Sequence, residues 1–301
     1  MRKLIRDFLK RFGYDIIKTG IPYIPKTRGE GLVIVGKYHI LMPGNNAQLG
    51  NYKIYPDLNS QLGRLAATIY KKYPGMTVID VGANVGDTIA VLKSVIDVPV
   101  IAVEGDEVCC KYLEKNTKQF KNINIIKKFL GDKSQIADVN IEHSGWNTTI
   151  IPGGTGNQQI TFSTLDEAID TAGLQELQLK LLKVDVEGFD TIVLRGAAGI
   201  IEKHKPVLFF EYNRKNMKAI HEEGLSTILS FERSGYDKIV FFDHKGSLVL
   251  ATDMKNTEVI TYMHNYISSD KNLLAYYDIC IFHSSDTALA GEFLKEERTY
   301  L

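Results

Sequence analysis

A short glycine turn with acidic neighbours is the feature of this sequence best suited to bind a ligand. It follows an apolar segment in Val78-Ile-Asp-Val-Gly-Ala-Asn-Val-Gly-Asp87. Glycine allows the backbone to come close to a ligand, because no Cβ stands in the way. We predict that the ligand-binding residues here are Asp80, Gly82, Ala83, Asn84, Gly86 and Asp87.

The two acids of this turn distinguish between classes of ligand. The turn departs from the Gly-x-Gly-x-x-Gly pattern of dinucleotide-binding proteins, and Asp80 and Asp87 would repel a pyrophosphate. S-adenosylmethionine instead carries an ammonium group and a sulfonium, so an acid here can bind its amino group directly or through water. The turn therefore favours S-adenosylmethionine over NAD.

Two further acids follow the next two predicted strands. Glu104, in Val103-Glu-Gly-Asp106, can accept hydrogen bonds from both hydroxyls of a ribose, which suits NAD equally well. Asp132 can accept a hydrogen bond from an adenine amino group, and Gly105 lies beside Glu104. Each acid also has a structural interpretation as a turn residue or a solvated strand end. Their succession at strand ends favours a nucleoside-bearing ligand.

Apolar segments alternate with amphipathic segments from residue 61 onward. We predict strands over 77–81, 100–103, 123–127, 181–184 and 207–210, and helices over 61–73, 87–95, 107–120, 164–172 and 191–202. Strands separated by such helices form right-handed βαβ units with a parallel sheet buried on both faces. The predicted fold class is therefore a doubly wound α/β domain, with the acidic turns at the carboxyl edge of its sheet.

The C-terminal part differs in kind from this alternation. Segments 238–243 and 248–251 flank the turn His244-Lys-Gly246, and a last strand covers 277–282. Hairpin strands pair antiparallel, so we predict a mostly parallel sheet that ends in antiparallel strands.

The first 60 residues form a separate region in our prediction, with one domain over 61–301. Apolar and basic residues on opposite sides of a helical pattern predict a basic amphipathic helix within residues 1–18. Two interpretations stay open: the helix docks on its own domain or on a second subunit of a homo-oligomer, or it makes peripheral contact with an anionic membrane. Residues 20–60 are rich in Pro, Gly, Asn and Tyr, have one predicted strand over 32–35, and resemble a cap.

The composition excludes several classes of function. The 36 basic residues equal the 36 acidic residues, so no global positive field gathers nucleic acid. The three cysteines have no metal-ligand spacing and form no disulfide framework, which indicates a reducing compartment. No apolar run approaches the roughly 18 residues of a membrane span, and charges interrupt any secretory signal. We expect a cytoplasmic protein without a transmembrane span.

The motifs together resemble the FkbM-type family of class I S-adenosylmethionine-dependent methyltransferases. The resemblance is carried by Val78–Asp87, Val103–Asp106, Gly131-Asp-Lys-Ser134, Leu182-Lys-Val-Asp-Val-Glu-Gly-Phe-Asp190, Val193-Leu-Arg-Gly-Ala197 and Pro206-Val-Leu-Phe-Phe-Glu-Tyr212. It covers roughly residues 75–215. The family more often has a proline after the ribose-binding acid, where this chain has Gly105.

The resemblance implies a Rossmann-like sheet of seven strands with the last strand antiparallel. It also implies O-methylation of a sugar or another small hydroxylated metabolite, a reaction of polysaccharide biosynthesis among others. A glycan or small molecule is therefore the expected substrate. Residues 1–60 carry little of the resemblance, so substrate recognition there stays open.

Methyl transfer requires alignment of two substrates and removal of one proton. Asp185, Glu187 and Glu211 lie at the ends of adjacent predicted strands, on the same edge as the glycine turn. They are our candidates for the catalytic base or for orienting the acceptor. Three such oxygen donors could equally hold Mg²⁺. Glu187 and Asp190 also fit a structural role at the N-terminus of the following helix.

A polar segment over 142–149 is the candidate for substrate binding. We expect it to be a loop, with His143, Trp146 and Asn147 reaching over the cleft. Trp146 offers a flat surface to a sugar ring, although a lone tryptophan also serves as a packing anchor.

Two other functions compete with methyl transfer. The first is an NAD-dependent oxidoreductase, which Asp80 and the missing third glycine disfavour. The second is a non-catalytic module that binds the cofactor without transferring a methyl group.

Overall fold

The computed structural model describes residues 29–144, 147–152, 158–269 and 274–300. The basic amphipathic helix predicted within residues 1–18 lies outside these residues. Among the described helices, none is both long enough and apolar enough to cross a membrane.

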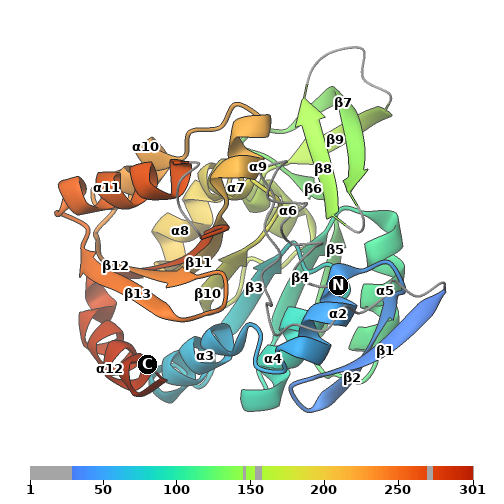
Figure 1. The fold of residues 1–301 in the computed structure, drawn as a ribbon, viewed down its shortest axis with the longest axis horizontal. Helices are drawn as coiled ribbons and strands as arrows, with labels where there is room; N and C mark the ends of the chain where they lie inside the picture. Colours follow the sequence, from blue (N-terminus) through green and yellow to red (C-terminus); the bar gives the residue numbers. More distant parts are fainter. Residues whose placement is uncertain (1–28, 145–146, 153–157, 270–273, 301) are drawn as a thin grey trace, which may run out of the picture.

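A large sheet forms the centre of the molecule (Figure 1). Its strands are β3 (Thr77–Val81), β4 (Val100–Glu104), β5 (Ile123–Lys127), β10 (Leu179–Val184), β11 (Val207–Tyr212), β12 (Tyr236–Asp243), β13 (Leu248–Asp253) and β14 (Tyr277–His283). They lie in the order β13-β12-β14-β11-β10-β3-β4-β5. The strands from β5 to β11 run parallel, and β14 lies antiparallel between β11 and β12. The predicted doubly wound, mostly parallel fold is confirmed, and β13 is one strand more than the expected seven.

Helices cover both faces of this sheet (Figure 1). One face carries α3 (Ser60–Lys72), α4 (Asp87–Val95), α5 (Glu107–Thr117) and α12 (Thr287–Glu297). The other carries α6 (Leu165–Thr171), α7 (Asp190–Arg195), α8 (Ala198–His204), α10 (Leu225–Ser230) and α11 (Thr257–Ser268). The remaining short helices are α9 (Arg214–Ala219), η1 (Ser284–Asp286) and η2 (Arg298–Tyr300).

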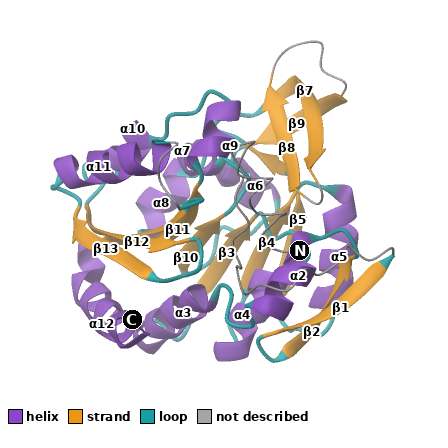
Figure 2. Ribbon diagram, in the orientation of Figure 1, coloured by secondary structure: helices purple, strands orange, loops and turns teal. Residues whose placement is uncertain are grey.

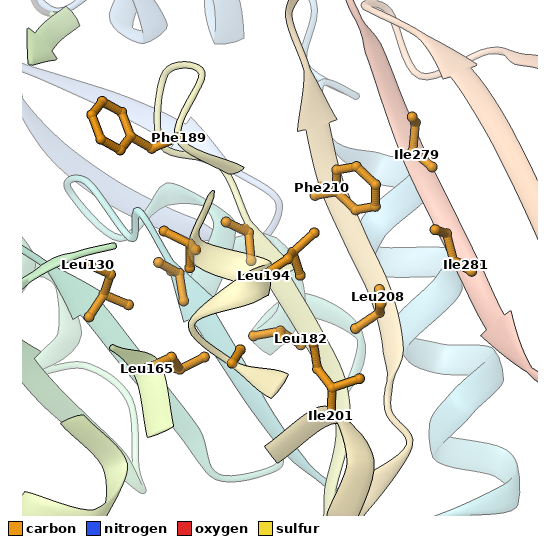
Figure 3. Close-up of a cluster of buried hydrophobic side chains, with 14 of the residues drawn as sticks. Leu130, Leu165, Leu182, Phe189, Leu194, Ile201, Leu208, Phe210, Ile279 and Ile281 are labelled. Carbon is orange, nitrogen blue, oxygen red and sulfur yellow. The ribbon is translucent and has the colours of Figure 1, made fainter. Parts of the chain in front are cut away.

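Alternating side chains of the strands supply two separate apolar cores. On β11, Leu208 and Phe210 join the core under α7 and α8, whereas Val207 and Phe209 join the core under α3 and α12. Figure 3 shows Leu208 and Phe210 next to Ile279 and Ile281 of the neighbouring β14. Because successive side chains of a strand point to opposite faces, a continuous apolar run is buried on both sides.

The cap consists of a hairpin and a helix that pack beside α4. The hairpin is β1 (Glu30–Val35) with β2 (Tyr38–Pro43), and the helix is α2 (Ala47–Ile54). Val35 and Ile40 are fully buried and belong to a third apolar cluster together with Ala90 and Val91 of α4. The cap is thereby held against the element that follows the glycine turn.

A second, four-stranded sheet projects from the top of the domain (Figure 2). It contains β6 (Phe129–Leu130), β7 (Gln135–Ser144), β8 (Asn147–Pro152) and β9 (Gln158–Ser163), in the order β6-β9-β7-β8. The predicted loop over 142–149 was therefore wrong, because β7 and β8 pair antiparallel from Val139 to Ser144. The β-branched run Thr148-Thr-Ile-Ile151 favours this strand.

The helix predicted over 191–202 is in fact two helices. It is interrupted between α7 and α8 at Gly196, where a Cβ would lie 2.1 Å from the carbonyl oxygen of Gly131. This close approach ties the end of α7 to the chain after β6.

Candidate active site

One large cavity opens at the carboxyl edge of the parallel strands. Its volume is about 1350 Å³. The lining comes from the glycine turn, the ends of β4, β10 and β11, the β12–β13 turn, and residues 46–60 of the cap. Such a volume is large enough for a nucleoside-bearing ligand and a second small molecule together.

The glycine turn lies at the cavity wall, close to the chain that follows β10. Gly82 has φ +73°, and a Cβ there would lie 1.8 Å from the carbonyl oxygen of Asp185. Gly82, Asn84 and Asp87 line the cavity. Ala83 and Gly86 are not among the lining residues, and Gly86 begins α4 in a left-handed conformation.

We expect Gly82→Ala to destabilise the protein more than Gly173→Ala does. Gly173 also has a left-handed φ, +68°, but no atom lies within 4 Å of its Cβ position. Gly173→Ala therefore measures only the cost of a side chain at a left-handed φ, about 1–3 kcal/mol. The additional loss of stability in Gly82→Ala measures the clash with Asp185. Urea unfolding of both variants measures the difference, and equal losses would contradict the close approach of β3 and β10.

Asp80 is fully buried and is not among the residues that line the cavity. Its carboxylate lies 2.9 Å from the Nζ of Lys183 and accepts a hydrogen bond of 2.5 Å from Thr88. Asp80 is 0% exposed, and the Lys183 side chain only 4%. Asp80 and Asp185 raise the pKa of Lys183 although burial opposes its charge. The charge of Asp80 is therefore compensated inside the protein.

Glu104 lines the cavity from the end of β4. Its carboxylate accepts hydrogen bonds from the backbone N–H groups of Asn84 (2.9 Å) and Asp106 (2.8 Å). Burial raises its pKa, and these donors oppose the shift. At Gly105 a Cβ would lie 2.4 Å from the Phe129 ring, so glycine allows this ring to stand beside Glu104.

Asp132 does not lie with the other predicted cofactor residues. Its side chain is 40% exposed and pairs with Arg195 at 3.5 Å. The cavity near Glu104 is lined by Lys128, Phe129, Leu130 and Phe162. An adenine ring would therefore find apolar side chains here, with Phe162 stacked on Phe189 at 6.0 Å between ring centroids.

Four carboxyl groups line the cavity on the other side of β3 from Glu104: Asp185, Glu187, Glu211 and Asp278. Glu211 and Asp278 are direct neighbours in the antiparallel pair of β11 and β14. Burial, followed by the charge of Asp185, raises the pKa of Glu187 to about 7 and that of Asp278 to about 8. The same two causes raise the pKa of Glu211. The structure thus brings the three predicted catalytic residues together and adds a fourth acid.

Glu187 is held in an unusual backbone conformation. Its φ is +51°, which is uncommon for a residue other than glycine. Asn216 donates a hydrogen bond of 2.6 Å to its carboxylate, and Asp190 accepts from the N–H groups of Val186 and Gly188. Such conformations persist where the surroundings fix them and cluster at active sites. Asp190 therefore holds the loop, whereas Glu187 faces the cavity.

Two of the three residues predicted to bind the substrate lie in the four-stranded sheet. His143 lies on β7 and Asn147 begins β8, whereas Trp146 is outside the described residues. Within the described part of the chain, no group of three His, Cys, Asp or Glu side chains could hold a metal ion.

The structure adds four residues that the sequence analysis did not select: Tyr52, Lys183, Asn216 and Asp278. Lys183 and Asp278 had a signal, because each is a charged residue inside an apolar strand pattern. Tyr52 and Asn216 had none, since their partners Asp87 and Glu187 are distant in sequence.

Solved structures similar to this chain include methyltransferases. No curated protein sequence matches the chain. It is similar to the methyltransferase FkbM of Methylobacillus flagellatus KT, with 16% identity and a TM-score of 0.38, over 57% of this chain and 43% of that one. It is also similar to the precorrin-6y C5,15-methyltransferase of Geobacter metallireducens GS-15, with 10% identity and a TM-score of 0.36, over 73% and 87% of the two chains. The chain thus spans less than half the length of the first of these proteins.

The sheet topology, with β14 antiparallel between β11 and β12, and the cavity at the carboxyl edge define the class of fold, a Rossmann-like α/β domain. The family model of the methyltransferase FkbM domain matches residues 80–238, which is more than half of the chain. The chain therefore belongs to the FkbM methyltransferase family.

Proposed function

We propose that this protein transfers the methyl group of S-adenosylmethionine to a hydroxyl group of a sugar or another small hydroxylated metabolite. The observation that carries the proposal is one cavity with two different ends. Glu104, with the Phe129 ring beside it, lines the cavity at the end of β4, and four carboxyl groups line it at β10, β11 and β14, on the other side of β3. The first end suits a nucleoside, and the second suits a polyol that must lose a proton.

The residues at the first end fit the methyl donor. Glu104 would accept hydrogen bonds from the ribose hydroxyls, and Asn84 and Gly82 would offer backbone next to it. Asp87 would bind the ammonium group, because the charge of Asp80 is already compensated by Lys183. Asp132 would contribute only through its ion pair with Arg195.

The residues on the other side of β3 would orient the acceptor and accept its proton. When bound, S-adenosylmethionine supplies an electrophilic methyl group on a sulfonium. The carboxylate of Glu187 would accept the hydroxyl proton of the acceptor as its oxygen takes up the methyl group. A pKa of about 7 suits this role, because a base works best near the pH of the reaction. Asp185 and Glu211 would orient the acceptor.

We assign no step to Mg²⁺. The acids that could have bound it are not arranged as a metal site within the described residues.

Two measurements test the function. Calorimetry should detect binding of S-adenosylhomocysteine and not of NAD, and tritium from labelled S-adenosylmethionine should appear in a nucleotide sugar, a lipid-linked glycan or a small hydroxylated metabolite. Binding of NAD alone would indicate the oxidoreductase. Binding of S-adenosylhomocysteine without transfer to any of these acceptors would indicate the non-catalytic module.

Glu104→Gln should weaken S-adenosylhomocysteine binding by about 10- to 100-fold. A hydrogen bond to a charged group contributes about 1.5–3 kcal/mol, and about 1.4 kcal/mol corresponds to a factor of ten. Calorimetry measures the dissociation constant, with Glu107→Gln on the exposed start of α5 as the control. An unchanged affinity would show that the ribose lies elsewhere.

A further inference from the structure

The cap and the glycine turn are joined by a buried hydrogen bond. Tyr52 of α2 is 2% exposed, and its hydroxyl donates to Oδ2 of Asp87 at 2.9 Å. Asn59 donates to the same hydroxyl from its Nδ2 at 3.1 Å. The tyrosine hydroxyl therefore accepts one hydrogen bond from Asn59, so its own proton is available for the hydrogen bond to Asp87.

Asp87 lies where the bond from Tyr52 matters for a ligand. It is 5% exposed, it lines the cavity, and it begins α4 directly after the glycine turn. The ionisable groups that act on it are Tyr52 from α2, Asp80 from β3 and Lys183 from β10. Burial raises the pKa of Asp87, whereas Tyr52 and Lys183 lower it.

The two acids of the turn thus have different partners. Asp80 is paired with a cation, Lys183, which cancels its charge. Asp87 has a neutral donor, which holds the carboxylate in place and leaves its charge available to a cation in the cavity.

We propose that Tyr52 is a positioning residue that fixes Asp87 for the ammonium group of the methyl donor. Through α2, the cap is then part of the cofactor site and does more than cover the cavity. This inference rests on the proposed function. It gives the N-terminal region, which lies outside the family match to residues 80–238, a role in cofactor binding.

The test compares Tyr52→Phe with Tyr38→Phe. Both variants keep the ring and lose one hydroxyl of the cap, but Tyr38 donates to the carbonyl oxygen of Lys93, in the last turn of α4. Calorimetry with S-adenosylhomocysteine should show about tenfold weaker binding for Tyr52→Phe at neutral pH, equal to about 1.4 kcal/mol. Tyr38→Phe should bind like the wild type.

The pH dependence separates positioning from a general loss of structure. Without the hydroxyl the pKa of Asp87 should rise further, and the binding that needs ionised Asp87 is lost as the pH falls through that pKa. The factor between Tyr52→Phe and wild type should therefore increase as the pH is lowered. A factor that is constant over the whole pH range in which the protein stays folded would overturn the inference, because a structural defect weakens binding equally at each pH.

A double-mutant cycle gives a second criterion. In the Asp87→Asn background, Tyr52→Phe should have no further effect on affinity, since the carboxylate it positions is absent. Additive losses would refute the coupling. If the wild type itself fails to bind S-adenosylhomocysteine, the proposed function fails, and the inference fails with it. If the wild type binds and Tyr52→Phe binds equally well, only the inference fails.

Discussion

Lys183→Met should reduce the free energy of unfolding by about 3–5 kcal/mol, the usual loss when one partner of a buried ion pair is removed. Asp80 would keep its bond to Thr88 but lose its partner Lys183 at a site that is 0% exposed. Lys183 also donates to the carbonyl oxygen of Gly82 at 3.2 Å. The variant should therefore loosen the glycine turn as well as the sheet.

The measurement is urea unfolding, with Lys180→Met as the matched control. Lys180 lies on the same strand, but it is only half-buried and donates to the carbonyl oxygen of His204. Its Nζ also lies 4.6 Å from the centroid of the Tyr73 ring. Loss of the hydrogen bond and of this cation–π contact should together cost less than about 2.5 kcal/mol. The double variant Asp80→Asn with Lys183→Met should recover part of the loss, because no unpaired charge remains buried. A similar stability for the two lysine variants would refute the buried pair.

Glu187→Gln should lower the rate of methyl transfer by about 10²- to 10⁴-fold, the usual contribution of a general base. The amide keeps the size of the side chain but cannot accept the proton of the acceptor hydroxyl. Affinity for S-adenosylhomocysteine should stay at the wild-type value, because Glu187 belongs to the carboxyl-lined end of the cavity. Single-turnover transfer of a tritiated methyl group to the acceptor identified by the screen measures the rate.

The pH profile gives the same role a second test. The raised pKa of Glu187 means that its basic form is present above about pH 7 and is lost as the pH falls below it. The wild-type rate should rise through this range, and the Glu187→Gln rate should not. Glu202→Gln, on the exposed side of α8, should match the wild type. A wild-type profile that persists in Glu187→Gln would move the proton transfer to another group, with Glu211 the next candidate.

The sequence alone determined the fold class and the edge of the sheet where the cavity lies. The apolar segment at Thr77–Val81 became a fully buried strand, because such a run can be covered only on both faces of a sheet. Glycines and acids at strand ends then had to meet at one edge, since parallel strands end on the same side. Glu104 and Glu187 reach the cavity for this reason.

Local patterns were less informative where pairing decides the conformation. The polar residues around His143 predicted a loop, but pairing of β7 with β8 makes the segment part of a hairpin. Strand formation depends on the partner strand and the packing surface more than on the residues themselves. The predicted helix over 191–202 likewise ends early at Gly196, where another part of the chain comes too close for a side chain.

Only the tertiary structure decided which acid does what. Asp80 and Asp87 are equivalent in the sequence motif, yet Lys183 from β10 pairs with one and Tyr52 from the cap with the other. The charge and proton affinity of a carboxyl group depend on burial and on groups within a few ångströms, and those groups come from distant parts of the chain. A linear motif shows neither the burial of a carboxyl group nor its neighbours from distant parts of the chain. It can therefore place an acid at the edge of the sheet but cannot assign its role.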